Sequence, residues 1–200
     1  MTKALIVVDM ENDFLPGGAL GVPGGSEIVD PILQLMKKFP HVIATLDWHP
    51  PNHCSFAASH PGKKVGDEIE IKGRVQHLWP VHCVQNTKGA ELAHGFSKDQ
   101  FETIIYKGSN LNIDSYSAFY DIAHEKSTGL TEYLRTHNIT HVVIVGLAFD
   151  YCVFYSALDA RRDGFDVTVM PKLCRCIDPS KQNEVIETLR LQGVHIATTS

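Results

Sequence analysis

An unbroken apolar strand that leads through a small-residue turn to a cysteine is the feature that most constrains this sequence. Residues 142–145 are β-branched and apolar at every position, which predicts a strand buried on both faces of a parallel sheet. Residues 146–148 leave the strand, and Asp150 is placed to cap the next helix. Cys152 then falls in the first helical turn, where the positive end of the helix dipole favours a thiolate. This stretch alone fits a nucleophile and an ordinary buried cysteine equally well.

Predicted strands and helices alternate along most of the chain. Strands are expected at residues 4–8, 41–46, 101–106, 140–145, 165–170 and 194–197, and helices at residues 26–39, 130–137, 152–163 and 181–192. Continuous apolar strands alternating with helices predict an α/β fold with a six-stranded, mainly parallel sheet and helices on both faces. Residues 48–100 contain no long periodic segment, and a loop region of this length usually serves or covers a functional site.

Length and composition bound the remaining possibilities. The 200 residues predict one domain over 1–200, and the net charge of −5 comes without any basic run. Neither nucleic acid nor an anionic membrane surface is therefore an expected partner. Apolar runs are too short to cross a bilayer and no leader segment precedes the first strand, so a cytoplasmic protein is expected. The five cysteines are an odd number and predict free thiols rather than a disulfide framework.

Reactive side chains follow the predicted strands at their carboxyl ends. Asp9, Asp47 and Lys107 each end a strand, and Cys152 follows a fourth. Each has an ordinary structural explanation alone, but the carboxyl ends of parallel strands share one sheet edge, where sites form. Asp9 is suited to accept the thiol proton, and Lys107 to stabilise the thiolate. The backbone N–H groups of Ala148 and Cys152 are placed to hold an oxyanion. This set predicts acyl transfer from an amide or ester.

A second cluster has the composition of a metal site. Asp47 and His49 lie two residues apart on an extended segment, so their side chains share one side. With His82 they form an oxygen-and-imidazole set suited to zinc, iron or manganese, with open coordination positions. His53 is either a fourth ligand or a neighbouring histidine on the substrate side, and the residues alone leave both open.

Motifs typical of one family occur in order along almost the whole chain. They are VDMENDF with GGAL (8–20), DWHPPNHCSF (47–56), WPVHCVQ (79–85), YKG (106–108), DSYSAF (114–119) and GLAFDYCV (146–153). On these motifs the chain resembles the nicotinamidases, a branch of the cysteine hydrolases that also contain the isochorismatases. The combination of DWH with WP-x-HC separates nicotinamidases from isochorismatase relatives, which lack the metal ligands.

The resemblance implies a three-layer α/β/α fold and hydrolysis of nicotinamide to nicotinate and ammonia through a cysteine thioester, a step of NAD salvage. Pyrazinamide is a second expected substrate. It also implies that Asp9, Lys107 and Cys152 form a catalytic triad, and that a cis peptide precedes Ala148, whose N–H joins that of Cys152 in the oxyanion hole. Because family members occur as monomers, dimers and larger rings, a homo-oligomer is allowed but its size is not fixed.

The resemblance further assigns a metal and a ring pocket. A divalent ion, zinc foremost, would bind the pyridine nitrogen and water, and the matching ligands are Asp47, His49, His82 and, as in some members, His53. Aromatic and apolar residues at the positions that line the ring pocket are Phe14, Leu20, Trp79, Tyr116 and Tyr151.

Two residues depart from the family pattern. Glu11 stands where glutamine is commoner, and Phe149 where threonine is frequent. Phe149 is close enough in sequence to reshape the approach to Cys152, which leaves the selectivity among aromatic amides open.

Three other functions are weighed against this one. Another cysteine amidohydrolase, acting on a carbamoyl or ureido substrate, would not need the metal cluster. A non-catalytic binding or scaffold protein would need neither the triad nor the metal ligands. A thiol redox protein would depend on Cys174 and Cys176, whose C-x-C spacing is shorter than the usual C-x-x-C pair.

Overall fold

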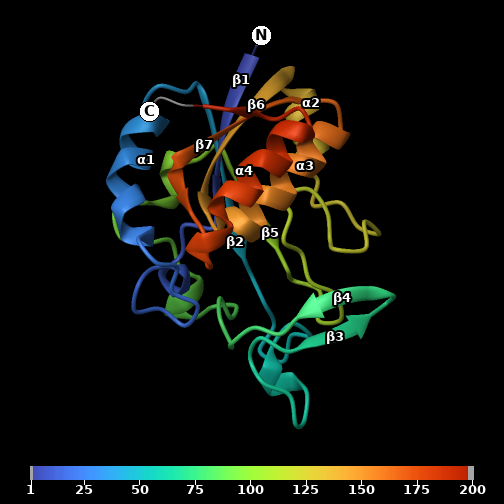
Figure 1. The fold of residues 1–200 in the computed structure, drawn as a ribbon. Coiled ribbons are helices and arrows are strands. Elements are labelled where there is room, and N and C mark those ends of the chain that lie inside the picture. The colour runs from blue at the N-terminus through green and yellow to red at the C-terminus, as the bar shows by residue number, and fades with distance from the viewer. Residues whose placement is uncertain (1, 198–200) are drawn as a thin grey trace.

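A six-stranded parallel sheet forms the centre of the computed structural model, which describes residues 2–197 (Figure 1). The strand order is β5-β2-β1-β6-β7-β8, and every neighbouring pair is parallel. The strands are β1 (Thr2–Val8), β2 (His41–Asp47), β5 (Thr103–Lys107), β6 (Ile139–Leu147), β7 (Asp166–Arg175) and β8 (His195–Ile196). The predicted parallel sheet is therefore confirmed.

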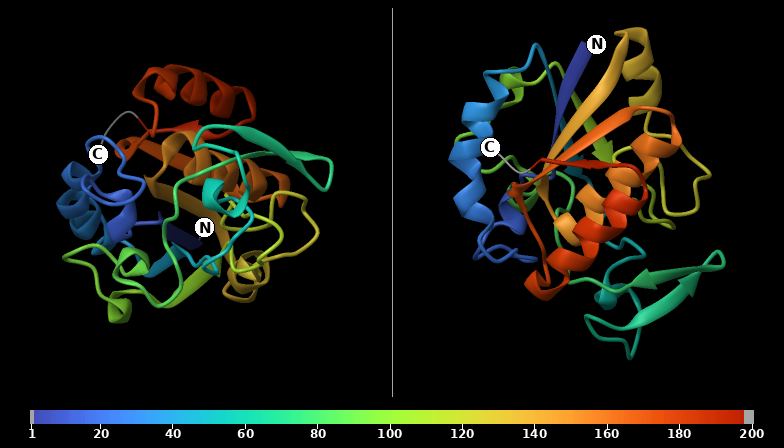
Figure 2. Two further views of the ribbon diagram at one scale, coloured as in Figure 1. Left: turned by 90° about the horizontal axis from the view of Figure 1, so that it is seen from below. Right: turned by 45° about the horizontal axis from the view of Figure 1, so that its top comes forward.

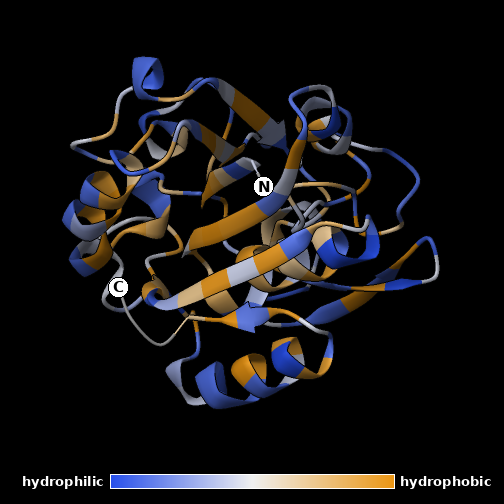
Figure 3. Ribbon diagram, turned by 90° about the horizontal axis from the view of Figure 1, so that it is seen from above, coloured by the Kyte–Doolittle hydropathy of each residue, from blue (hydrophilic) through white to orange (hydrophobic). Residues whose placement is uncertain are grey.

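Helices cover both faces of this sheet and complete the expected three-layer α/β/α fold (Figure 2). The helix α1 (Val29–Met36) lies on one face, and α2 (Leu130–Thr136), α3 (Phe154–Arg162) and α4 (Gln182–Leu191) lie on the other. The side chains of the central strand β1 explain why both faces are covered. Ala4, Ile6 and Val8 of β1 pack in the core beneath α2–α4, whereas Leu5 and Val7 pack in the core beneath α1. Successive side chains of a strand point to opposite faces, so an unbroken apolar strand supplies both cores (Figure 3).

The order of the strands creates a crevice at one edge of the sheet. From β1 the chain moves outward through β2 to β5, and β6 then returns to pair with the other side of β1. Ligands of open α/β sheets bind at such a reversal, outside the carboxyl ends of the strands. The residues that follow β1, β2, β5 and β6 therefore meet at this crevice.

The predicted loop region 48–100 contains a hairpin that the sequence reading missed. Strands β3 (Glu68–Ile71) and β4 (Arg74–His77) pair antiparallel, away from the main sheet (Figure 1). Lys72 and Gly73 form the turn with φ of 51° and 71°, both positive as a two-residue hairpin turn requires. The signal was present, because glutamate and isoleucine alternate immediately before this Lys-Gly pair.

Boundaries differ most around β7 and α3. The predicted strand 165–170 continues to Arg175 across an irregularity, since Ile144 pairs with Val169 but Gly146 pairs with Cys174. Pro171, which has no N–H to donate, lies in the extra residues of this bulge. The helix predicted from residue 152 begins instead with a π-helical turn, Phe149–Val153, and α3 follows it.

Short 3₁₀ turns complete the fold. They are Asn12–Phe14, Gly25–Ile28, Ala57–Ser59, Lys88–Ala90, Lys98–Gln100 and Pro179–Lys181. Among the described residues, no helix combines the length and the apolar character that crossing a membrane would need.

Candidate active site

The turn after β6 carries the predicted nucleophile. The Leu147–Ala148 peptide bond is cis, as the resemblance implies. A π-helical turn follows, in which the Val153 N–H donates to the Ala148 carbonyl at 3.0 Å, and Cys152 is buried within this turn. This geometry places the thiol at the reversal point of the sheet.

Asp150 does not cap the helix, contrary to the expectation. Its carboxylate accepts the N–H groups of Ile177 at 2.9 Å and Asp178 at 3.0 Å, and the π-helical turn has no side-chain cap. Asp150 therefore ties the nucleophile turn to the segment after β7, a distant pairing that local sequence cannot reveal.

Lys107 lies at the centre of the reactive side chains. Its side chain is fully buried, and its ammonium lies 2.8 Å from the Asp9 Oδ2 and 2.5 Å from the Asp47 Oδ1. The same ammonium lies 3.4 Å from the Cys152 Sγ and donates to the Ser115 carbonyl at 3.2 Å. The structure thus brings together all three residues predicted as a triad. Their roles remain predictions.

Asp9 leaves β1 in a left-handed backbone conformation, with φ of 49°. The Thr45 hydroxyl donates to the Asp9 Oδ1 at 2.5 Å, and this bond fixes the carboxylate beside Lys107. Burial raises the pKa of Asp9 above its ordinary value, although the Lys107 ammonium opposes the rise. A raised pKa brings a carboxylate closer to the range in which it exchanges protons efficiently near neutral pH.

The electrostatics of Cys152 differ from the expectation of a stabilised thiolate. Burial raises the pKa of the Cys152 thiol well above its ordinary value, and this effect exceeds the opposing effect of Lys107. The carboxylates of Asp9 and Asp47 also raise this pKa, and they lie too far along the sequence to be seen from the turn alone. The resting thiol is therefore protonated, and its reaction needs a base in contact with it.

The predicted metal ligands Asp47, His49 and His82 converge on one point. One ligand atom from each lies within 4.8 Å of the others. The Nδ1 atom of His49 bonds to the Gly108 carbonyl at 2.9 Å, and that of His82 bonds to the Pro80 carbonyl at 2.8 Å. A carbonyl only accepts, so each Nδ1 carries the hydrogen and each Nε2 is free to bind a metal. These Nε2 atoms lie 3.5 and 3.8 Å from the Asp47 Oδ2.

The pKa values of Asp47 and His82 are shifted toward the forms that bind a cation. Burial by itself raises the pKa of Asp47, but Lys107 and His49 outweigh it and hold the pKa below its ordinary value. Burial lowers the pKa of His82 to about 4. An ionised carboxylate and a neutral imidazole are the forms that coordinate metals, so these states of Asp47 and His82 fit a divalent ion. Burial lowers the pKa of His49, but the charge of Asp47 outweighs this effect and raises that pKa.

His53 lies beside this group and not within it. Its ring stacks on His49 with centroids 4.2 Å apart, and its Nε2 lies 3.4 Å from the Ile113 carbonyl. Its ligand atoms group with those of His49 and Asp114 rather than with Asp47 and His82. Direct ligation by His53 stays a prediction.

All five residues predicted for the ring pocket line one cavity, together with the predicted metal ligands Asp47, His49 and His82 and the predicted nucleophile. The lining residues are Phe14, Leu20, Asp47, His49, Trp79, His82, Asp114, Tyr116, Ala148, Tyr151, Cys152 and Ile177. Trp79 and Tyr151 meet edge to face with centroids 4.8 Å apart, and Tyr116 lies 5.4 Å from Tyr151. The cavity lining therefore combines an aromatic wall of Trp79, Tyr116 and Tyr151 with the Cys152 thiol and the predicted metal ligands.

Three residues named from the sequence do not line this cavity. Phe149 is fully buried in the core with Val153 and Ala157 and does not line the cavity, so it does not reshape the approach to Cys152. Cys174 and Cys176 are free thiols, as expected, and burial raises the pKa of each to about 12. A redox role for that pair would need thiolates that this environment suppresses.

Glu11, which departs from the family pattern, has a structural role that the sequence alone does not indicate. Glu11 is fully buried, and its Oε2 accepts the Asp47 N–H at 2.8 Å. Burial, with the charges of Asp9 and Asp47, raises the pKa of Glu11 well above its ordinary value. Glu11 thus supports the backbone of a metal ligand. Asp114 and Ile177, which line the cavity, were also missed as site residues, because only tertiary packing brings them there.

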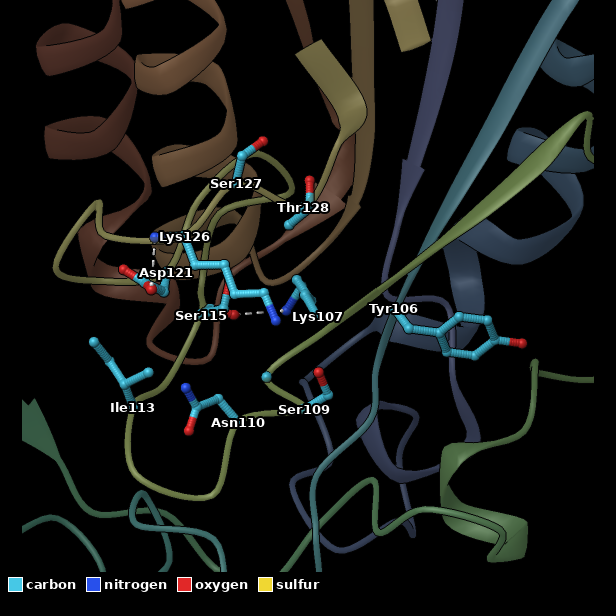
Figure 4. Close-up of a pocket in the computed structure, with 11 residues that line it drawn as sticks. Tyr106, Lys107, Ser109, Asn110, Ile113, Ser115, Asp121, Lys126, Ser127 and Thr128 are labelled. Carbon is cyan, nitrogen blue, oxygen red and sulfur yellow. Dashed lines mark hydrogen bonds between the residues drawn. The ribbon is translucent and has the colours of Figure 1, made fainter. Parts of the chain in front are cut away.

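A second cavity of about 160 Å³ approaches Lys107 from another side (Figure 4). Its lining includes Ser109, Asn110, Lys126 and Thr128, and two further lining residues, Lys107 and Ser115, are joined by the hydrogen bond from the Lys107 ammonium to the Ser115 carbonyl. Neither Cys152 nor a predicted metal ligand lines it.

Comparison with known proteins places this geometry in a family. The model of the isochorismatase domain matches residues 3–200. A nicotinamidase of Acinetobacter baylyi is 46% identical over 175 residues, which cover 88% of this chain and 82% of that protein. The chain belongs to the isochorismatase family. Its similarity to nicotinamidases identifies the nicotinamidase branch of these hydrolases.

Solved structures of family members agree with this placement. A yeast nicotinamidase bound to the inhibitor nicotinaldehyde has a TM-score of 0.94 and 35% identity, and the match covers 99% of this chain and 100% of that one. A pyrazinamidase of Pyrococcus horikoshii in complex with zinc has a TM-score of 0.82 and 35% identity, and the match covers both chains fully.

Proposed function

We propose that this protein hydrolyses nicotinamide to nicotinate and ammonia, with Cys152 as the nucleophile. The observation that carries this proposal is the shared cavity, whose lining combines a buried thiol, the two histidines predicted to bind a metal and an aromatic wall. The wall suits a planar ring, and the thiol suits attack on a carboxamide carbon. The relatives named nicotinamidase support the same substrate class.

Asp9 and Lys107 supply the proton chemistry of the first half-reaction. Because the Cys152 thiol is protonated at rest, Asp9 removes its proton as the sulfur attacks the carboxamide carbon. Lys107, which contacts both groups, stabilises the carboxylate before transfer and the thiolate after it. The N–H groups of Ala148 and Cys152 hold the oxyanion. Asp9 then returns the proton to the nitrogen as the C–N bond breaks. Ammonia departs, and the acyl group remains on Cys152 as a thioester.

Water completes the reaction by hydrolysing the thioester. Asp9 removes a proton from the water, whose oxygen forms a bond to the acyl carbon while the C–S bond breaks. The proton returns to the Cys152 sulfur, which restores the thiol and releases nicotinate. One side chain therefore serves as base and acid in turn, and the raised pKa of Asp9 favours this use.

Asp47, His49 and His82 would hold a divalent ion, and two histidines with one carboxylate and open positions fit zinc. Such an ion supplies Lewis-acid binding of the ring nitrogen and of water. His49 and His82 present their Nε2 atoms because their Nδ1 atoms are held by backbone carbonyls. The protein's part is to orient these ligands before the substrate arrives.

The proposal is tested by measuring ammonia release from nicotinamide, with elemental analysis of the same sample. Purified protein should release ammonia and contain a stoichiometric divalent metal, and a chelator should abolish release reversibly. Cys152→Ala should release none while keeping its metal. Ammonia release by Cys152→Ala would refute the covalent mechanism, and release from a carbamoyl amine but not from nicotinamide would favour the other class of amidohydrolase.

A second substrate follows from the same cavity. Pyrazinamide offers a ring of the same size with a carboxamide, and the relative from Pyrococcus horikoshii is named a pyrazinamidase. The same assay with pyrazinamide should show ammonia release that also depends on Cys152.

A further inference from the structure

A glutamine on the separate hairpin is buried although the two residues before it in the strand are exposed. Gln76 of β4 has no exposed surface, whereas Val75 beside it is 64% exposed. Burying an amide costs free energy unless its polar atoms find partners, and an apolar side chain would fill the same space without that cost. The hydrogen bonds of this amide therefore identify what it does.

The Gln76 amide nitrogen bonds to two residues of the cavity wall. Nε2 donates to the Asp114 Oδ2 at 3.1 Å and to the Tyr116 Oη at 3.1 Å. The Trp79 indole N–H donates to the same Tyr116 Oη, also at 3.1 Å. Asp114, Tyr116 and Trp79 all line the cavity, but Gln76 does not. Gln76 thus bonds to residues of the cavity lining without being part of that lining.

The carbonyl oxygen of the Gln76 amide lowers the stability of the fold in this arrangement. The Gln76 Oε1 is buried and has no hydrogen-bond partner among the described residues. Nε2 has two hydrogens for three acceptors within hydrogen-bond distance, because the His77 carbonyl also lies 2.7 Å from it. An unsatisfied buried acceptor destabilises a fold. A residue chosen only for packing would avoid this cost, so the donor atom is the part of Gln76 that the structure uses.

We propose that Gln76 is a positioning residue that fixes Tyr116 and Asp114 and thereby sets the affinity of the cavity for the substrate ring. This inference rests on the proposed function for the identity of the ring. It makes the β3–β4 hairpin a part of the binding site, although none of its residues lines the cavity. The hydrogen bonds of Gln76 go to His77, Asp114 and Tyr116 and not to Cys152 or Asp9, so it acts on binding and not on the chemical step.

The first test separates KM from kcat in the full-length, metal-loaded enzyme. Gln76→Met keeps the length of the side chain and removes its donors. The KM for nicotinamide should rise about tenfold, the size of one lost buried hydrogen bond, while kcat stays within about twofold because the lost interaction is the same in the ground and transition states. Val75→Met, on the exposed side of the same strand, should leave both constants unchanged.

A double-mutant cycle asks whether Gln76 acts through Tyr116. Tyr116→Phe removes the shared oxygen, so adding Gln76→Met to it should raise KM clearly less than Gln76→Met does in the wild type. Equal effects of Gln76→Met in both backgrounds would refute positioning through Tyr116.

A spectroscopic measurement keeps the inference testable without activity. The chain has two tryptophans, and Trp48→Phe assigns their indole N–H signals in a nitrogen-15 correlation spectrum. Gln76→Met should shift the Trp79 signal and speed its hydrogen exchange, because the Tyr116 oxygen it bonds is no longer fixed. A wild type inactive on nicotinamide refutes the proposed function alone. An unmoved Trp79 signal or an unchanged KM in an active Gln76→Met enzyme overturns the role of Gln76.

Discussion

The Lys107 ammonium lies 2.5 Å from the Asp47 carboxylate, and this contact joins the nucleophile group to the metal group. Adjacent strands produce it directly, because Asp47 ends β2, Lys107 ends β5, and the two are paired in the register of the sheet. The carboxylates of Asp9 and Asp47 outweigh burial and raise the pKa of Lys107 well above its ordinary value. Lys107 is therefore a permanent buried cation that balances two buried carboxylates.

Lys107→Met should abolish ammonia release and destabilise the fold by about 3–5 kcal/mol, because it leaves the carboxylates of Asp9 and Asp47 buried without a counter-charge. Urea unfolding of the metal-free protein measures the loss. The matched control is Lys126→Met, which removes an exposed lysine at the nearby cavity and should change stability by less than about 0.5 kcal/mol. Equal stability of the two variants would show that Lys107 does not balance these charges.

Gly108→Ala should weaken metal binding about tenfold or more. A Cβ at Gly108 would lie 2.4 Å from the Cε1 of His49 and 2.6 Å from its Nδ1, so the imidazole must move away from the carbonyl that orients it. Gly108 also has φ of +64°, so an alanine there strains the backbone in addition to its contact with His49. The control must reproduce the backbone strain without that contact. Gly62→Ala is the control, with φ of +80° and no atom within 4 Å. Competition with a chromogenic chelator measures both affinities, and equal values would exclude a steric effect on His49.

Glu11→Gln should stabilise the metal-free protein at pH 7 but not at pH 4. Burial raises the pKa of Glu11 in the folded state above its ordinary value of 4.5. As the pH rises past 4.5, the unfolded chain loses this proton first, so stability falls with rising pH until the folded carboxyl also ionises. Glutamine keeps an acceptor for the Asp47 N–H without this dependence.

Thermal unfolding across this pH range measures the difference. A gain on the order of 2–4 °C at pH 7 corresponds to about 1 kcal/mol in a chain of this size. Glu91→Gln, at an exposed glutamate, should show no such trend. A Glu11→Gln protein that is less stable than wild type at pH 7 would contradict a protonated Glu11.

The sheet and the meeting of Asp9, Lys107 and Cys152 were predictable because they depend on local pattern and one topological rule. Apolar runs mark parallel strands, and the carboxyl ends of such strands share an edge. The supporting contacts were not predictable, because they join residues far apart in sequence. Gln76 and Tyr116, which form a hydrogen bond, are 40 residues apart in the sequence, and Asp150 and Ile177 are 27 residues apart. The protonated state of Cys152 was missed for the same reason, since burial by the whole fold outweighs the local helix start.

Phe149→Thr should lower stability and leave selectivity unchanged. Phe149 is fully buried in the core on the α2–α4 face of the sheet and does not line the cavity. Removing most of its ring should cost about 3 kcal/mol, while the ratio of kcat/KM for nicotinamide and pyrazinamide should change less than about twofold. Leu20→Ala is the matched control, because Leu20 lines the cavity and is only partly buried, whereas Phe149 is buried and does not line it. It should alter kcat/KM with a smaller loss of stability. Urea unfolding and paired ammonia assays measure both variants. A selectivity change in Phe149→Thr that exceeds that of Leu20→Ala would place Phe149 in the substrate's path after all.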